Sequence, residues 1–174
     1  MKLVLSKFIE TWSQFWFENI APTNLACARI VVFSSAAIFF WNLHPSELLS
    51  LEYGTWSPIG VYKLLPAPLP IVTYNLLIML WKASLPFAIL GCFSRITLPI
   101  CGLLGMIVLG YDYNYGTVYH SKHILALSMF ALSFSPAGDD LSIDICLKKK
   151  TRRLAYKYCW PLRLIQLSFC MFYF

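Results

Sequence analysis

Charged residues are scarce in this sequence: they make up 13% of its 174 residues, whereas hydrophobic residues make up 59%. Soluble domains usually carry about 25% charged residues and about half apolar ones. Length alone would favour one soluble domain. The long apolar runs override that default and predict an all-α, multi-pass transmembrane helical bundle. The lipid bilayer is therefore the expected partner of the chain.

Common catalytic and metal-binding patterns are also missing. The six cysteines include no C-x-x-C pair or zinc spacing, and most lie in apolar runs, where cysteine acts as a small hydrophobic residue. The sequence contains no H-E-x-x-H, P-loop or Gly-x-Ser-x-Gly motif. We therefore predict no disulfide and no metal site.

Apolar runs predict about four full spans and a shorter fifth one. The four cover about residues 26–41, 71–93, 96–111 and 123–134, and the fifth begins at Cys159. The connection after the first run contains five prolines between residues 45 and 70, a density that excludes a continuous helix there. Glycines at positions 102, 105 and 110 in the third span predict close helix packing.

The last run, "CWPLRLIQLSFCMFYF", has no polar flank on its far side. Sixteen helical residues cover about 24 Å, less than a hydrocarbon core of ~30 Å. Its one charge, Arg163, lies near the expected cytoplasmic end, where it can snorkel. We expect this helix to end in the outer half of the bilayer, as in a C-terminally incomplete domain that otherwise occupies residues 1–174.

Residues 1–20 predict an amphipathic helix rather than a signal peptide. Apolar side chains, two of them tryptophans, recur every three or four positions from Leu5 to Trp16, and Lys7, Glu10 and Gln14 fall between them. Such a helix is typical of the membrane interface.

The distribution of positive charge predicts the orientation. Six of the 14 Lys and Arg residues fall between Lys148 and Lys157, within a basic loop spanning residues 137–158. A soluble protein could use such a cluster to bind nucleic acid, but between two apolar helices it indicates a cytoplasmic loop, so we expect no nucleic-acid partner. Four crossings then place the N-terminus in the cytoplasm as well. The proline-rich connection and the segment 112–120 fall outside.

The segment "GYDYNYGTVYHSKH", residues 110–123, concentrates chemically active side chains at one membrane boundary. An ordinary interfacial belt of tyrosines is one reading. However, His120 and His123 are three residues apart, so a helix would place both on one face. Ionisable groups near a membrane are costly and are often functional. Elsewhere, Arg29 and Lys82 lie within spans and are expected to snorkel towards the interfaces.

Four stretches, taken in order, resemble the HTTM domain, the membrane domain of the vitamin K-dependent gamma-carboxylase family. "ACARIVVF" resembles the arginine motif of its first span, and "PLPIVTYNLLIMLWKASLPFAILGCFSRIT" resembles its second span and the following turn. "YHSKHILAL" with "SFSPAGDDLSIDICL" resembles its fourth span and a Ser-x-Asp, here Ser142 and Asp144. "WPLRLIQLSFCMFYF" resembles the opening of its fifth span. The likeness covers nearly the whole chain from about residue 20.

The resemblance implies an enzyme that uses a reduced quinone such as vitamin K hydroquinone, with O2 and CO2, to carboxylate glutamate. By local sequence, His120 matches the histidine of the family's His-Ser. If the position along the helix is used instead, His123 is the alternative match, and Lys122 is a neighbour of both. The family's proposed base is a lysine that would follow Phe174. The resemblance therefore implies that residues 1–174 alone are inactive, and that a protein substrate and a further C-terminal chain are the missing partners.

Two other functions remain open. The chain could be a non-catalytic membrane scaffold or remnant, or a quinone-interacting membrane subunit of the DoxX type. An in-frame Gly…Lys-Leu encoded after codon 174 would favour the enzyme, whereas a frameshift there would favour the remnant.

Overall fold

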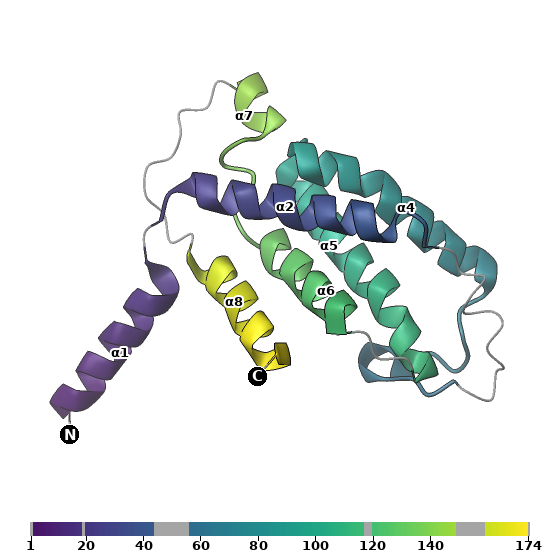
Figure 1. Cartoon of the computed structure of the whole chain (residues 1–174), viewed down its shortest axis with the longest axis horizontal. Helices are drawn as coiled ribbons and strands as arrows, with labels where there is room; N and C mark the ends of the chain where they lie inside the picture. The colour runs from purple at the N-terminus through teal and green to yellow at the C-terminus, as the bar shows by residue number, and fades with distance from the viewer. Residues whose placement is uncertain (1, 19, 44–55, 117–119, 149–158, 174) are drawn as a thin grey trace.

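The computed structural model describes residues 2–18, 20–43, 56–116, 120–148 and 159–173, and these residues form helices and turns with no strand among them. The chain is therefore all-helical, as predicted (Figure 1). The elements are α1 (Lys2–Phe17), α2 (Pro22–Phe40), η2 (Gly60–Leu64), α4 (Ile71–Leu90), α5 (Ser94–Gly110), η3 (Tyr111–Tyr115), α6 (His120–Ser133), α7 (Ile143–Lys148) and α8 (Cys159–Tyr173).

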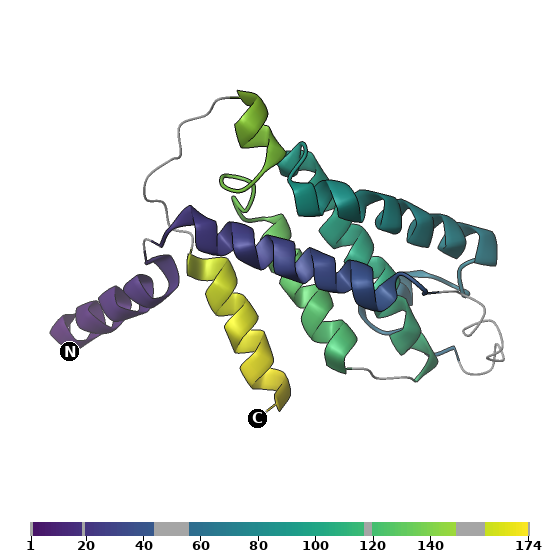
Figure 2. The same cartoon turned by 45° about the horizontal axis from the view of Figure 1, so that its top comes forward.

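Helix α5 lies between α4 and α6, while α2 packs across α4 and α6, and α8 packs on α6 (Figures 1 and 2). Thr23 at the start of α2 meets Asp140, which follows α6. Leu69 before α4 meets Tyr111 after α5. The bundle therefore has two ends. We call residues 20–29, 91–95 and 134–148 the loop end, and residues 40–43, 56–71, 110–116 and 120–123 the tyrosine end.

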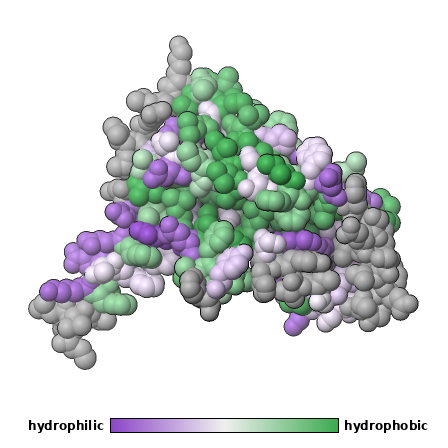
Figure 3. Space-filling model, in the orientation of Figure 1, coloured by the Kyte–Doolittle hydropathy of each residue, from purple (hydrophilic) through white to green (hydrophobic). Residues whose placement is uncertain are grey.

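Three segments are long and apolar enough to cross a membrane: Pro22–Phe40, Ile71–Leu90 and Ser94–Tyr115. The core between them is filled by large side chains such as Trp81, Phe33 and Leu98, all at most 1% exposed. Their outer faces are also apolar, with Ile38 76% and Val72 75% exposed, which suits a lipid environment better than water. Hydrophobic residues spread over the middle of the face in Figure 3.

The fourth and fifth crossings stay predictions. Helix α6 has 14 residues and α8 has 15. At 1.5 Å per residue these helices are about 21 and 22 Å long, less than a hydrocarbon core of ~30 Å.

The predicted glycine packing is confirmed where α5 meets α6. A Cβ at Gly102 would overlap the hydroxyl of Ser133, and one at Gly105 would lie 2.8 Å from the Met129 methyl. These glycines let the two backbones approach more closely than any larger residue would allow.

Helix α1 is confirmed as a helix and extends away from the bundle (Figure 1). Its contact with the rest of the chain is mainly with α8, where the Arg163 guanidinium lies 4.6 Å from the centroid of the Phe15 ring. Phe8 and Trp12 stay 63% and 57% exposed. That uncovered apolar face agrees with the predicted position at a membrane interface, which stays a prediction.

The expectation that Arg29 snorkels is wrong. Its side chain is fully buried, and its two Nη atoms donate hydrogen bonds to the carbonyl oxygens of Ala137, at 3.0 Å, and Leu141, at 2.6 Å. The chain after α6 folds back over the end of the bundle and brings these carbonyls to the guanidinium. Two of its three nitrogens thus find acceptors inside the protein, whereas the buried Nε has none, and the side chain does not extend to solvent. Lys82 is half-buried and donates to the Leu43 carbonyl at 3.0 Å, beyond the end of α2.

Of the predicted basic loop 137–158, residues 137–148 are described and include α7. Residues 149–158 lie outside the described part of the chain.

Candidate functional site

The tyrosine end contains a largely buried ion pair. The α5 helix tightens into η3, which places Asp112 opposite Lys122 on the first turn of α6. The Lys122 ammonium contacts the Asp112 carboxylate, and their side chains are only 15% and 8% exposed. The same ammonium lies 6.0 Å from the centroid of the Phe40 ring. Little water reaches these charges, so their attraction is stronger than that of a surface pair.

His123, the residue after Lys122, contacts two aromatic rings. Its ring centroid is 4.1 Å from that of Tyr113, at an interplanar angle of 32°. Phe172, near the end of α8, lies on it at 5.6 Å. Residues 113, 123 and 172 thus bring η3, α6 and α8 together around one imidazole.

His120 begins α6, but its side chain lies outside the described part of the structure. The prediction that His120 and His123 share a face therefore stays a prediction. Within the described residues, no group of three or more His, Cys, Asp or Glu side chains could hold a metal ion.

A cluster of aromatic rings packs around Tyr111 at the tyrosine end. The Tyr111 ring lies 4.4 Å from that of Tyr74, 5.8 Å from that of Tyr62 and 5.7 Å from that of Trp56. The Tyr111 hydroxyl accepts a hydrogen bond from the backbone N–H of Leu69 at 2.8 Å. This cluster joins α4, η3 and the proline-rich connection.

Asn114 holds the proline-rich connection in place, a role that the sequence did not reveal. It is fully buried, and its side-chain oxygen accepts a hydrogen bond from the Ile59 N–H at 2.9 Å. Its backbone carbonyl accepts from the Ser57 N–H at 2.8 Å, and its amide donates to the Tyr111 carbonyl at 2.8 Å. An asparagine flanked by tyrosines was the only signal in the sequence, and its partners in the connection, Ser57 and Ile59, are more than 50 residues away.

Tyr62 of η2 connects the proline-rich connection to the end of α5. Its hydroxyl donates to the Ile107 carbonyl at 2.6 Å. Burial, and then the negative charge of Asp112 and the neighbouring Tyr111, raise the pKa of Tyr62 well above the ordinary value of a phenol. The Tyr62 hydroxyl therefore stays protonated and acts as a hydrogen-bond donor.

The tyrosine end thus combines an imidazole, an ion pair and closely packed aromatic rings at the end of apolar helices. Neutral imidazole and phenol hydroxyls can exchange hydrogen bonds with a hydroxylated aromatic ring, and aromatic side chains can stack on it. This is chemistry suited to a quinol-sized, lipid-soluble molecule.

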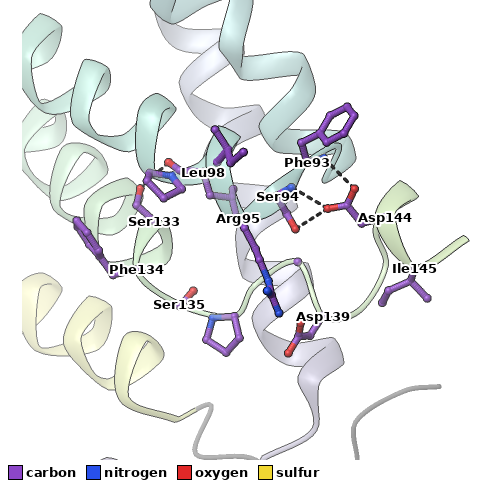
Figure 4. Close-up of a pocket in the computed structure, with 14 residues that line it drawn as sticks. Phe93, Ser94, Arg95, Leu98, Ser133, Phe134, Ser135, Asp139, Asp144 and Ile145 are labelled. Carbon is purple, nitrogen blue, oxygen red and sulfur yellow. Dashed lines mark hydrogen bonds between the residues drawn. The ribbon is translucent and has the colours of Figure 1, made fainter. Parts of the chain in front are cut away.

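The loop end brings together three of the stretches that carry the family resemblance. Arg29 of the first stretch binds the segment 137–141, as described above. Asp144 of the third stretch accepts hydrogen bonds from the backbone N–H groups of Phe93, at 2.8 Å, and Ser94, at 2.7 Å, in the turn of the second (Figure 4). Gly91 in that turn has φ of 68°, and a Cβ there would lie 2.5 Å from a guanidinium nitrogen of Arg29. These contacts give the three stretches a structural role.

A cavity of about 580 Å³ lies next to this junction, between the start of α5, the end of α6 and the segment up to Ile145. Figure 4 shows Arg95 extending from α5 toward the segment that carries Ser135 and Asp139. The cavity is at the opposite end of the bundle from His123.

No protein-family model, curated protein or solved structure matches this chain. The resemblance therefore rests on the four stretches alone.

Proposed function

We propose that this chain is a multi-pass membrane protein related to the membrane domain of vitamin K-dependent gamma-carboxylase, and that its tyrosine end binds a lipid-soluble hydroquinone. The observation that carries the proposal is His123, in contact with the rings of Tyr113 and Phe172, on the residue next to Lys122 of the shielded pair with Asp112. The contacts among Arg29, the turn 91–94 and Asp144 support the relationship.

The residues of the tyrosine end fit such a ligand. Aromatic rings offer faces for stacking, and His123 offers a hydrogen-bonding nitrogen at the same place. The ion pair of Lys122 and Asp112 places a fixed dipole beside His123. Its negative end can hold a proton on a bound hydroxyl, and its positive end can favour loss of that proton. A reduced quinone would supply the O2-driven formation of a strong base, which the side chains of this chain cannot supply.

We further propose that the N-terminus and the basic loop are cytoplasmic and that the tyrosine end faces the other side. Lys149, Lys150, Arg152, Arg153 and Lys157, the charges that decide this by the positive-inside rule, lie in the segment 149–158, outside the described residues. The end at which α6 leads into that segment is the loop end, which agrees with this arrangement.

Quinol binding can be measured by the quenching of tryptophan fluorescence. The purified chain in lipid nanodiscs is titrated with vitamin K hydroquinone under anaerobic conditions. We expect saturable quenching, with affinity weakened about tenfold or more by His123→Ala, because a hydrogen-bonding nitrogen and the ring that holds Tyr113 and Phe172 in place are lost. Glu10→Gln, an exposed change on α1, is the control and should bind as the unmodified chain does.

Non-saturable quenching, or equal affinity of His123→Ala, would refute the site and leave the scaffold as the better function.

A second assay follows CO2 incorporation into a glutamate peptide. Since the base implied by the family falls after Phe174, we expect no carboxylation by residues 1–174. Quinone-dependent incorporation would contradict this and make Lys122 the first candidate base. Quinol oxidation without carboxylation would favour the DoxX-type subunit.

A further inference from the structure

Two apolar side chains of the short helix η2 are the most exposed large hydrophobic side chains in the described part of the chain. Leu64 is 83% exposed and Val61 is 79% exposed, and Ile59, the residue before the helix, is 57% exposed. Neighbouring exposed apolar side chains of this kind mark surfaces that contact a membrane or another protein.

The residues of η2 fall on three faces, because a 3₁₀-helix has three residues per turn. Val61 and Leu64 are three positions apart and share one face. Tyr62 lies on the second face, and Lys63, which is exposed, lies on the third. The helix therefore has an apolar face, a phenol face and a charged face.

The phenol face packs against the end of α5 (Figure 1). The Tyr62 hydroxyl donates to the Ile107 carbonyl at 2.6 Å, and a Cβ at Gly110 would lie 3.3 Å from the same hydroxyl. Since Gly110 is the last residue of α5, Tyr62 reaches about one turn back along that helix. This contact fixes η2 beside the last turn of α5.

The part of the bundle beside η2 suits lipid. Ile107 belongs to the segment Ser94–Tyr115, which is long and apolar enough to cross a membrane and continues past Ile107 to Tyr115. The Ile107 side chain is 38% exposed. Val72, on the first turn of α4 at the same end of the bundle, is 75% exposed. The apolar face of η2 is therefore held next to a surface that lipid covers when the helices cross the membrane.

We propose that η2 is inserted into the lipid leaflet at the tyrosine end, with Val61 and Leu64 among the acyl chains near the headgroups. Tyr62 holds the helix against α5, and Lys63 extends its ammonium to the headgroup phosphates. The occupant of the apolar face is lipid rather than a second protein, because Tyr62 places this face beside a membrane-spanning helix. The proline-rich connection would then leave the membrane and return to it at η2.

The test measures which solvent surrounds each face of η2. An amino acid with a fluorescent propionylnaphthalene side chain is placed by stop-codon suppression at one position at a time, in the full chain in nanodiscs. This method leaves the native cysteines unchanged, and the probe is excited apart from tryptophan. Iodide quenches the probe from water, and a phospholipid with a nitroxide near the headgroup end of an acyl chain quenches it from the leaflet.

The probe replaces Val61 or Leu64 on the apolar face. Lys63, on the charged face of the same helix, is the matched control, and Leu76, 55% exposed within α4, is the control for contact with lipid. We expect iodide to quench at Val61 and Leu64 about threefold less than at Lys63, and nitroxide lipid to quench there about as strongly as at Leu76. Both side chains are almost fully exposed, so either position should accept the probe, and one suffices if the other variant does not fold.

Equal quenching by iodide at Val61, Lys63 and Leu64 would overturn the proposal, because the whole helix would then lie in water. Protection from iodide without quenching by nitroxide lipid would also overturn it, since a second copy of the chain or another protein would then cover the face. The measurement uses no quinol, so its result is independent of whether the tyrosine end binds one.

Discussion

Removing the Asp144 carboxylate tests how the loop end is held together. Helix α5 begins directly after Phe93, whose φ is 49°, and no side chain within the turn itself caps the helix. Asp144, 50 residues further along the chain, accepts from the Ser94 N–H in its place. Asp144→Ala should therefore release the start of α5 from the segment that follows α6.

The expected cost follows from the bonds that are lost. Loss of an N-terminal cap costs about 0.5–2 kcal/mol. The Ser94 hydroxyl, on a residue only 7% exposed, also loses a charged acceptor 2.8 Å away, worth about 1.5–3 kcal/mol. Together the free energy of unfolding should fall by about 2–5 kcal/mol for Asp144→Ala. Asp144→Asn keeps one acceptor oxygen and should lose about half as much.

Unfolding in mixed micelles, with increasing mole fraction of sodium dodecyl sulfate, measures this difference. Circular dichroism and tryptophan fluorescence should give the same transition, so that a two-state free energy applies. Glu10→Ala on the exposed face of α1 is the control and should change stability by less than about 0.5 kcal/mol. A loss below about 0.5 kcal/mol for Asp144→Ala would refute the capping role. If that variant does not fold, Asp144→Asn decides the question.

Three further predictions concern other parts of the bundle. Gly91→Ala should destabilise the chain by more than about 1 kcal/mol in the same assay, because φ is 68° and a Cβ would lie 2.5 Å from a guanidinium nitrogen; unchanged stability would contradict that packing. Asp112→Asn and Lys122→Met should each cost about 2–4 kcal/mol, while the double variant costs less than their sum, and strictly additive costs would argue against a shielded pair. A reporter fused after Arg153 should stay cytoplasmic and one inserted near Ser57 should be exported; the reverse result would overturn the proposed orientation.

The helices could be predicted closely because their signals are local. The predicted span 71–93 is helix α4, Ile71–Leu90, and the predicted span 96–111 is helix α5, Ser94–Gly110. An apolar run with prolines before it and a glycine after it needs no distant contact to be recognised. The close approach of α5 and α6 also followed from glycines at small intervals in one helix.

The candidate site was only partly predictable. Clustered ionisable groups in residues 110–123 indicated the right region, since such groups are costly near a membrane. That cluster did not reveal which groups would pair: Asp112 with Lys122, and His123 with Tyr113 and Phe172. These contacts depend on the turn between α5 and α6 and on the position of α8, which no local pattern specifies.

The sequence by itself determined that the chain is helical and that its apolar segments suit lipid, because both properties depend on the amount and spacing of apolar side chains along the chain. Only the tertiary structure decided which groups its buried polar residues bind. Arg29 is satisfied by Leu141, 112 positions away, and the start of α5 is capped by Asp144, 50 positions away. A buried polar group must find a partner wherever the fold brings one, so the partners follow from the packing of the helices and not from neighbours in sequence.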